Sequence, residues 1–161
     1  MVIEKGILRA QKSIWIATAT LKDMQVVGTG KRSFSIVKNL NDLAKKGIQI
    51  KLLHSGEPSQ PFKKSLYNLD RNPNFQMRQC LRSHFKAVII DGSWMYMGSA
   101  NMTGAGLGAK SEKNRNFEVG LVTQNRAEID DIQSLFNLIW EGEMCIDCDR
   151  IKFCKKPLNE I

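Results

Sequence analysis

Residues 83–101 read SHFKAVIIDGSWMYMGSAN. The run of apolar and β-branched residues predicts a strand over 84–90, and Asp91-Gly92 is a strong signal for a hairpin turn into a second strand over 94–97. Because the hairpin folds the chain back, the GSAN segment after the second strand should return to the start of the first. We therefore expect an antiparallel strand pair with polar residues of both segments at its open end.

The segment before this hairpin has the pattern of a strand, a helix and a second strand. SIWIATAT (13–20) alternates and is rich in β-forming residues, the apolar spacing over 33–46 is helical, and IQIKLL (48–53) is typical of a strand. Residues 24–32 include two glycines and predict a loop. This order predicts a right-handed crossover between two parallel strands.

The rest of the chain predicts further elements around the same sheet. Expected helices cover 3–12, 61–69 and 127–140, and expected strands cover 75–82 and 116–123. In the last helix, the residues expected to face inward are Ile129, Ile132, Leu135, Phe136 and Ile139. The predicted fold class is α/β, a mixed β-sheet flanked by helices. We expect one domain over residues 1–140 and a cysteine-containing tail over 141–161 packed on it.

Composition and charge narrow the class of protein and of partner. A chain of 161 residues with 42% hydrophobic and 25% charged residues is long enough for one domain with a core, which excludes disordered and collagen-like classes. The net charge is +8, and the excess lies before Leu121, where 19 basic and 8 acidic residues give +11. Such a balance fits a polyanionic partner, either nucleic acid or an anionic phospholipid surface. A solvated basic surface without a partner is the alternative.

No segment has the pattern of a membrane span or of a secretion signal. The longest apolar runs, such as 87–90, are far shorter than the ~20 residues of a spanning helix, and residues 1–10 carry charges in place of an apolar signal core. We therefore expect a cytoplasmic protein with no transmembrane segment. The chain begins directly at a predicted helix, which leaves room for an upstream anchor or domain.

The polar residues of 83–101 suit the binding and attack of a phosphate group. His84 and Lys86 are two apart on the predicted strand, so both should project from one face, and the hairpin should bring Ser99 and Asn101 beside them. An ammonium and an amide can hold phosphate oxygens, and an imidazole can attack phosphorus. Each residue alone has an ordinary structural explanation, and it is the joint spacing that favours a site.

The spacing His84-x-Lys86-x4-Asp91-x6-Gly98-Ser99-x-Asn101 resembles in full the HKD motif of the phospholipase D superfamily. With Asn116-Phe117-Glu118, the resemblance covers about a quarter of the chain. It implies the α/β fold of that family and phosphodiester cleavage through a phosphohistidine intermediate, with no cofactor for catalysis. Within the motif, Asp91 lies in the hairpin, which favours a structural role over proton transfer.

The same resemblance implies a role for each of the other matching residues. His84 would be the nucleophile, and Lys86 and Asn101 would hold the phosphate oxygens with help from Ser99. Glu118 matches the acidic residue that hydrogen-bonds the nucleophilic imidazole, and a solvent-facing strand residue is its alternative.

The number of histidines predicts the oligomeric state. The reaction needs two imidazoles, one to attack phosphorus and one to protonate the leaving oxygen. The chain has only His54 and His84, and His54 lies in HSG with no lysine two residues later, so it belongs to no second motif copy. Single-copy members of the family, such as small bacterial nucleases, pair across a two-fold axis. We therefore expect a homodimer with one composite active site.

The loop between the motif and Glu118 is basic and rich in glycine. It reads GLGAKSEKNRN (106–116), and Lys110, Lys113 and Arg115 within it are candidates for contacts with flanking phosphates. A solvated, mobile loop is the alternative.

Three of the four cysteines lie in the last 21 residues. Cys145-x2-Cys148 has the spacing of a zinc site, Cys154 follows it, and Cys80 lies four residues before His84. Four thiolates would form a tetrahedral, structural zinc site, with an iron–sulfur cluster as the less favoured occupant. Reduced cysteines without metal, or an oxidised pair, are the alternatives.

Three functions are compatible with these features. The first is a dimeric phosphodiesterase that acts on nucleic acid, an endonuclease. The second is a phospholipase D-type lipid hydrolase or transferase, for which Trp94, Met95, Met97 and Met102 are the only apolar candidates for an entry surface. The third is a nucleic-acid-binding module with weak or no catalysis, which the complete motif disfavours.

Overall fold

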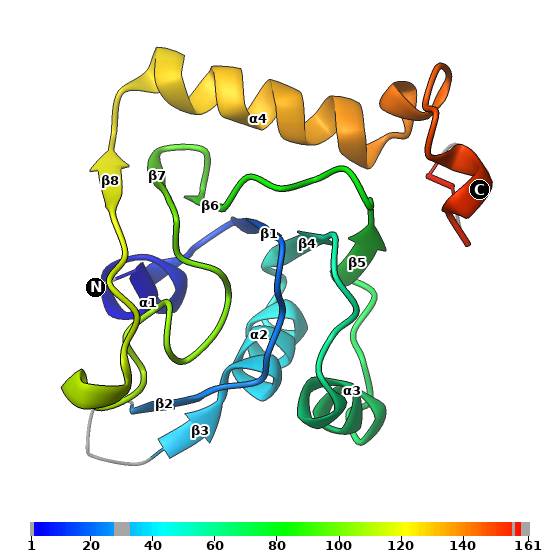
Figure 1. Ribbon diagram of the computed structural model, residues 1–161. Helices are drawn as coiled ribbons and strands as arrows, with labels where there is room; N and C mark the ends of the chain where they lie inside the picture. The colour runs from blue at the N-terminus through cyan, green and yellow to red at the C-terminus, as the bar shows by residue number, and fades with distance from the viewer. Residues whose placement is uncertain (1, 28–32, 156, 159–161) are drawn as a thin grey trace.

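The computed structural model describes residues 2–27, 33–155 and 157–158. Its centre is a six-stranded sheet with the strand order β5-β4-β1-β6-β7-β8 (Figure 1). The bounds of the strands are β1 (Ser13–Thr18), β4 (Gln49–His54), β5 (Phe75–Gln79), β6 (Ala87–Ile90), β7 (Trp94–Gly98) and β8 (Gly120–Thr123). The first three are parallel to one another, and β6, β7 and β8 pair antiparallel. The prediction of a mixed sheet is confirmed.

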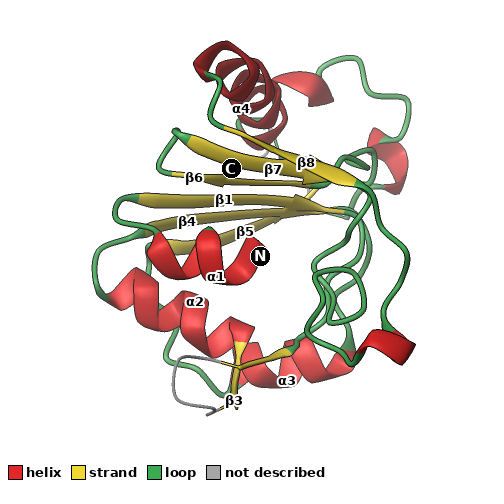
Figure 2. Ribbon diagram, turned by 90° about the vertical axis from the view of Figure 1, so that its left-hand side faces the viewer, coloured by secondary structure: helices red, strands yellow, loops and turns green. Residues whose placement is uncertain are grey.

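Helices cover both faces of this sheet, as Figure 2 shows. One face carries α1 (Val2–Lys5), a 3-10 helix at Ile7–Arg9, α2 (Ile36–Lys45) and α3 (Gln60–Tyr67), and the other carries α4 (Arg126–Trp140). Along β1, Ile14 and Ile16 belong to the core on the first face, and Trp15 and Ala17 belong to the core under α4. Successive residues of a strand face opposite sides, so this apolar run is buried on both.

The predicted parallel crossover is confirmed, with a small addition inside it. β1 pairs in parallel with β4, and α2 lies between them in the chain. The predicted loop over 24–32 is wrong in part, because β2 (Gln25–Val27) pairs antiparallel with β3 (Ser33–Ser35), and 28–32 lie outside the described residues. α2 begins at Ile36, later than predicted, because the Ser35 hydroxyl caps it by accepting from the Lys38 N–H at 3.3 Å.

Four strands are shorter than the sequence predicts, since β1 ends at Thr18, β5 ends at Gln79, β6 begins at Ala87 and β8 begins at Gly120. Residues 80–86 must travel from β5 at the sheet edge past β4 and β1 to reach β6, so they form a connection and not a strand (Figure 1). Before β8, the Val119 N–H donates to the Ser99 hydroxyl at 3.0 Å, which ends the regular pairing with β7.

The predicted helix over 127–140 is confirmed as α4, although the inward orientation predicted for one of its residues is wrong. Ile129 and Phe136 are fully buried, whereas Leu135 is 38% exposed. Further 3-10 helices cover Glu112–Asn114, Glu143–Cys145 and Ile151–Phe153. Among the described residues, no helix combines the length and the apolar composition needed to cross a membrane.

Candidate active site

The connection from β5 to β6 brings His84 and Lys86 to one end of the sheet. In the register of β6, Lys86 comes just before Ala87, which pairs with Ala17 on one side and with Met97 on the other. The Lys86 ammonium lies 3.3 Å from Nδ1 of the exposed His84 ring and donates to the His84 carbonyl at 2.8 Å. The two side chains therefore meet as expected, but they do so in the connection and not on a strand.

The turn after β7 fixes Asn101 beside the end of β1. Its Oδ1 accepts hydrogen bonds from the Ala19 N–H at 3.0 Å and the Thr20 N–H at 2.9 Å. Thr18 reinforces the turn, because its hydroxyl accepts from the Met102 N–H at 2.9 Å. Since two backbone donors occupy the side-chain oxygen, the amide nitrogen of Asn101 is the group left to donate to a ligand.

Gly98 is required where this turn leaves β7. A Cβ added there would lie 2.4 Å from the Val119 carbonyl and 2.6 Å from the Tyr96 hydroxyl. The glycine of the motif is thus explained by close packing against Tyr96 and the chain entering β8. Sequence reasoning missed Tyr96, because nothing in its spacing distinguishes it from an ordinary strand residue.

Glu118 is held beside the site by two side-chain donors. It accepts a very short hydrogen bond from the Ser99 hydroxyl and another from the Asn116 amide at 3.0 Å. These two hydrogen bonds, with a smaller contribution from the positive charge of Lys86, hold the pKa of Glu118 below its usual range. Glu118 is therefore ionised at neutral pH.

This arrangement differs from the expected one in two contacts. No hydrogen bond among the described residues joins Glu118 to His84, so the orienting contact with the imidazole is not formed within this chain. The Ser99 hydroxyl donates its hydrogen bond to Glu118, so it is not free to donate to phosphate oxygens. Asn116, whose role the sequence did not reveal, completes the cluster around Glu118.

Asp91 lies at the other end of β6 from His84, in the hairpin. Its carboxylate accepts from three successive backbone N–H groups, those of Gln11 at 2.9 Å, Lys12 at 2.7 Å and Ser13 at 2.8 Å. Its φ of 54°, followed by 59° at Gly92, fits the tight turn that the Asp-Gly pair predicts. These contacts fasten the hairpin to the start of β1. They give Asp91 a structural role and not one in proton transfer.

His54 ends β4 and is buried. Its Nδ1 lies 2.9 Å from the Gly56 carbonyl, and burial lowers the pKa of the imidazole. The ring is therefore neutral near pH 7. Its contact with Gly56 stabilises the turn that follows β4, which is the structural role that the absence of a second motif copy predicts.

A cleft of about 500 Å³ adjoins Asn101. Lys110 of the predicted basic residues lines it, together with Lys22 and Asn116, neither of which was predicted to contact a ligand. Lys113 and Arg115 are exposed and do not line it, and the Arg115 guanidinium instead donates to the Lys110 carbonyl at 2.6 Å. Lys22 could have been suspected from its place shortly after β1, at the end of the sheet where the motif residues gather.

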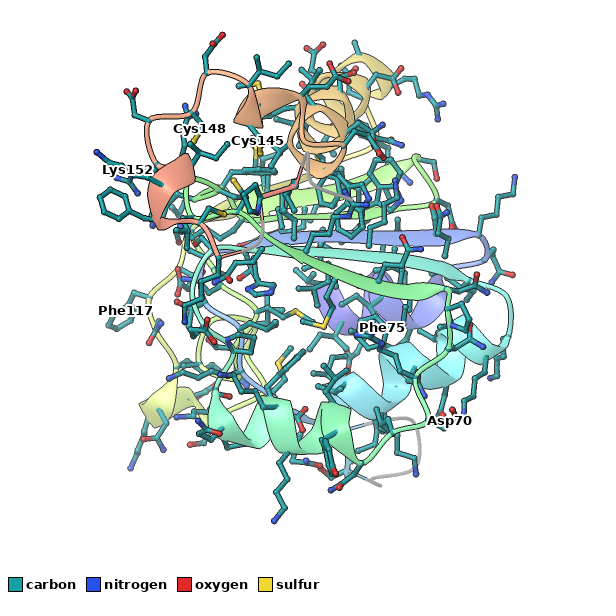
Figure 3. All side chains as sticks on the ribbon, turned by 90° about the vertical axis from the view of Figure 1, so that its right-hand side faces the viewer. Asp70, Phe75, Phe117, Cys145, Cys148 and Lys152 are labelled. Carbon is teal, nitrogen blue, oxygen red and sulfur yellow. The ribbon has the colours of Figure 1, made fainter. Side chains whose placement is uncertain are left out.

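An apolar margin borders the site along the edge strand. We use this name for Phe117, Val119, Leu121 and Val122, which are between 43% and 107% exposed. Figure 3 shows Phe117 projecting away from the body of the molecule. β8 is the last strand of the sheet, so its outer backbone groups are unpaired within the described residues.

The four cysteines together line one cavity, which shares no lining residue with the cleft beside Asn101. All four are half-buried and free of disulfides. Among the described residues, no three His, Cys, Asp or Glu side chains are already grouped around one point as a metal requires.

Comparison with known proteins identifies relatives of this arrangement. A family model described as "Cardiolipin synthase, PLD-like domain" matches residues 3–140. No curated protein matches the chain at a significant level. Among solved structures, NucT from Helicobacter pylori is similar with a TM-score of 0.60 and 21% identity, over 83% of this chain and 81% of that one. Nuc from Salmonella typhimurium, titled a phospholipase D family member, has a TM-score of 0.59 and 19% identity over 85% and 83% of the two chains. These likenesses show a shared fold.

Proposed function

Since the chain belongs to the phospholipase D-like family of phosphodiesterases, we propose that it is an endonuclease that cleaves nucleic acid as a homodimer. The observation that carries the proposal is the gathering of His84, Lys86 and Asn101 at one end of β1. An exposed imidazole, an ammonium and an amide donor are the groups that attack and hold a phosphate.

In the proposed reaction, a nitrogen of His84 attacks phosphorus while the bond to the leaving oxygen breaks. The partner's His84 protonates that oxygen, so the first step yields a phosphohistidine and a free alcohol. Water then attacks the phosphohistidine and gives its proton to the partner's His84, which restores both rings. Lys86 and the amide nitrogen of Asn101 stabilise the negative charge that develops on the phosphate oxygens.

Ionised Glu118 has a supporting role in this proposal. It lies close enough to Lys86 for their charges to interact, and Ser99 and Asn116 fix its carboxylate. The attraction between a carboxylate held in this way and the ammonium helps to orient Lys86. We therefore propose Glu118, Ser99 and Asn116 as positioning residues.

A second copy of the chain is the partner that the site requires. Single-copy members of this family act as dimers. The chain has one histidine suited to catalysis, His84, because His54 is buried and bonded to Gly56. The apolar margin next to Glu118 and the unpaired edge of β8 are the surface we assign to the dimer interface. A two-fold axis there would bring two copies of the site together.

Nucleic acid is the substrate class that the surroundings favour. The net charge is +8, and the cleft beside Asn101 carries Lys22 and Lys110 with the amide of Asn116. Ammonium groups around a phosphate site contact the neighbouring phosphates of a polynucleotide. Of the methionines that could have formed a lipid entry surface, Met95 and Met102 are buried in the core.

The test offers the purified protein six substrates in EDTA: single-stranded DNA, duplex DNA, single-stranded RNA, duplex RNA, phosphatidylcholine and cardiolipin. Nucleases of the phospholipase D superfamily act without a metal cofactor, so EDTA removes contaminating metal-dependent nucleases and leaves this activity. We expect cleavage of at least one nucleic acid. Turnover of lipid alone, or binding of nucleic acid without cleavage, would contradict the proposal.

Two variants tie that activity to the site. His84→Ala should lower kcat/KM by at least about 10³-fold, with His54→Asn as the matched histidine control that keeps activity. Asn101→Asp should keep the contacts with Ala19 and Thr20 but place an anion where a donor is needed, for a loss of about 10²-fold. Thermal unfolding of each variant separates loss of chemistry from loss of fold. Activity that survives His84→Ala belongs to a contaminant or to another site.

A further inference from the structure

A cavity of about 130 Å³ lies between the C-terminal tail and the segment that leads into His84. Its lining includes every cysteine of the chain: Cys80, Cys145, Cys148 and Cys154. Cys80 comes directly after β5, and the other three belong to the tail, where Figure 3 shows Cys145 and Cys148 close together. Cys80 and the tail cysteines, at least 65 positions apart in the chain, thus contribute thiols to one cavity.

We propose that these four thiols bind one zinc ion in a structural site, independently of the proposed nuclease function. Thiolates are preferred ligands of zinc, and four of them complete a tetrahedral structural site. The Cys145-x2-Cys148 pair supplies two ligands from one turn, in which the Cys148 N–H donates to the Cys145 carbonyl at 3.3 Å. The thiols line the cavity without yet being grouped around one point, so metal binding turns them toward a common centre.

The cavity wall carries positive charge, which would stabilise a negatively charged zinc–thiolate site. Four thiolates with one zinc ion carry a net charge of −2, which nearby donors must stabilise. Two cationic residues, Arg82 and Arg150, both line the cavity. Two cations on the wall therefore offset the charge of the proposed site.

Ser83 gives a second, independent indication of a ligand. Its side chain is 2% exposed and lines the same cavity, yet its hydroxyl has no hydrogen-bond partner among the described residues. A buried hydroxyl without a partner costs stability and calls for an explanation. A zinc-bound thiolate is an acceptor that would satisfy it.

The tail also lacks the apolar anchoring that a metal would replace. Met144, Ile146 and Phe153 are between 44% and 75% exposed, and Leu158 is the one large apolar side chain of the described tail that is buried. Structural zinc sites supply folding free energy to segments of this kind. Because Cys80 leads through Arg82 and Ser83 to His84, the same ion would also fix the connection that carries the nucleophile.

The first experiment measures metal in the 161-residue chain purified without chelator. We expect about one zinc ion per chain by mass spectrometry, and four thiols that react with a thiol reagent only after zinc is removed. Replacement of zinc by Co²⁺ should give the thiolate-to-cobalt charge-transfer bands of a tetrahedral site. Zinc-free protein with reactive thiols, a disulfide, or iron with inorganic sulfide would each overturn the proposal.

Variants then test each ligand against a matched control. Cys80→Ser and Cys148→Ser should each weaken zinc binding by at least about tenfold, whereas Met144→Leu, at another sulfur-bearing residue of the cavity wall, should leave it unchanged. Full zinc binding in Cys80→Ser would overturn the link between the tail and the catalytic segment. If a cysteine variant fails to fold, the cobalt spectrum of the unmodified chain still decides. None of these readouts depends on nuclease activity.

Discussion

At the scale of single residues, the Ser99–Glu118 pair shows how one hydroxyl can serve two neighbours. Ser99 donates to the Glu118 carboxylate and accepts from the Val119 N–H. It therefore holds an ionised group beside Lys86 and at the same time ends the pairing of β7 with the chain entering β8. The serine of the motif is better explained by this placement than by direct contact with phosphate.

The pair should contribute stability that depends on pH. Its hydrogen bond lowers the pKa of Glu118 in the folded state, so the stabilisation is present above the unfolded-state pKa and is lost as pH falls through the folded-state pKa. Ser99→Ala should therefore lower the free energy of unfolding near neutral pH, by at most about 1 kcal/mol in this solvent-exposed setting, and the loss should shrink in acid.

Urea denaturation over a series of pH values measures that difference. In a Glu118→Gln background, where no carboxylate titrates, Ser99→Ala should have an effect that does not change with pH. A pH-independent loss in the unmodified background as well would show that Ser99 acts only through Val119.

At the scale of elements, the β6–β7 hairpin is fastened to β1 by Asp91. Asp91→Ala removes the acceptor of three backbone N–H groups, at Gln11, Lys12 and Ser13. We expect a loss of about 2–3 kcal/mol in the free energy of unfolding, and Asp91→Asn should lose less, because it keeps one acceptor oxygen and tolerates positive φ. Chemical denaturation gives the stability, and kcat of the folded fraction should stay close to the unmodified value. A large fall in kcat at full stability would instead place Asp91 in the chemistry.

The elements also show which parts of the fold sequence patterns can predict. The apolar run of β1, the helix at α4 and the Asp91-Gly92 turn depend on neighbouring residues, and all three were predicted. Residues 80–82 and 84–86 were wrongly predicted as strand, because the path of this connection depends on β5 lying at the far edge of the sheet. Leu135 was wrongly placed inward, because the face that α4 buries depends on Trp15 and other residues of the sheet that pack beneath it.

At the scale of the whole molecule, the same division applies to the site. The motif spacing was enough to predict that His84, Lys86 and Asn101 come together. It did not reveal that the Asn101 side-chain oxygen accepts from backbone N–H groups, or that the Ser99 hydroxyl donates to Glu118. Nor did it reveal that Lys22 shares a cleft with Lys110. Those facts depend on contacts between segments distant in sequence, which no local pattern encodes.

A dimer with one composite site makes a quantitative prediction for mixed chains. If His84→Ala chains and unmodified chains are combined in equal amounts and allowed to exchange subunits, random pairing leaves about a quarter of the dimers with two imidazoles. Activity should then fall to about a quarter of that of the same total amount of unmodified protein, because a site with one His84 lacks either the nucleophile or the acid. Subunits that work independently would retain about half. Mixing with His54→Asn chains is the control and should cause no such loss. A separate variant, Val122→Asp, places a charge in the apolar margin, so it should sediment as a monomer and be inactive.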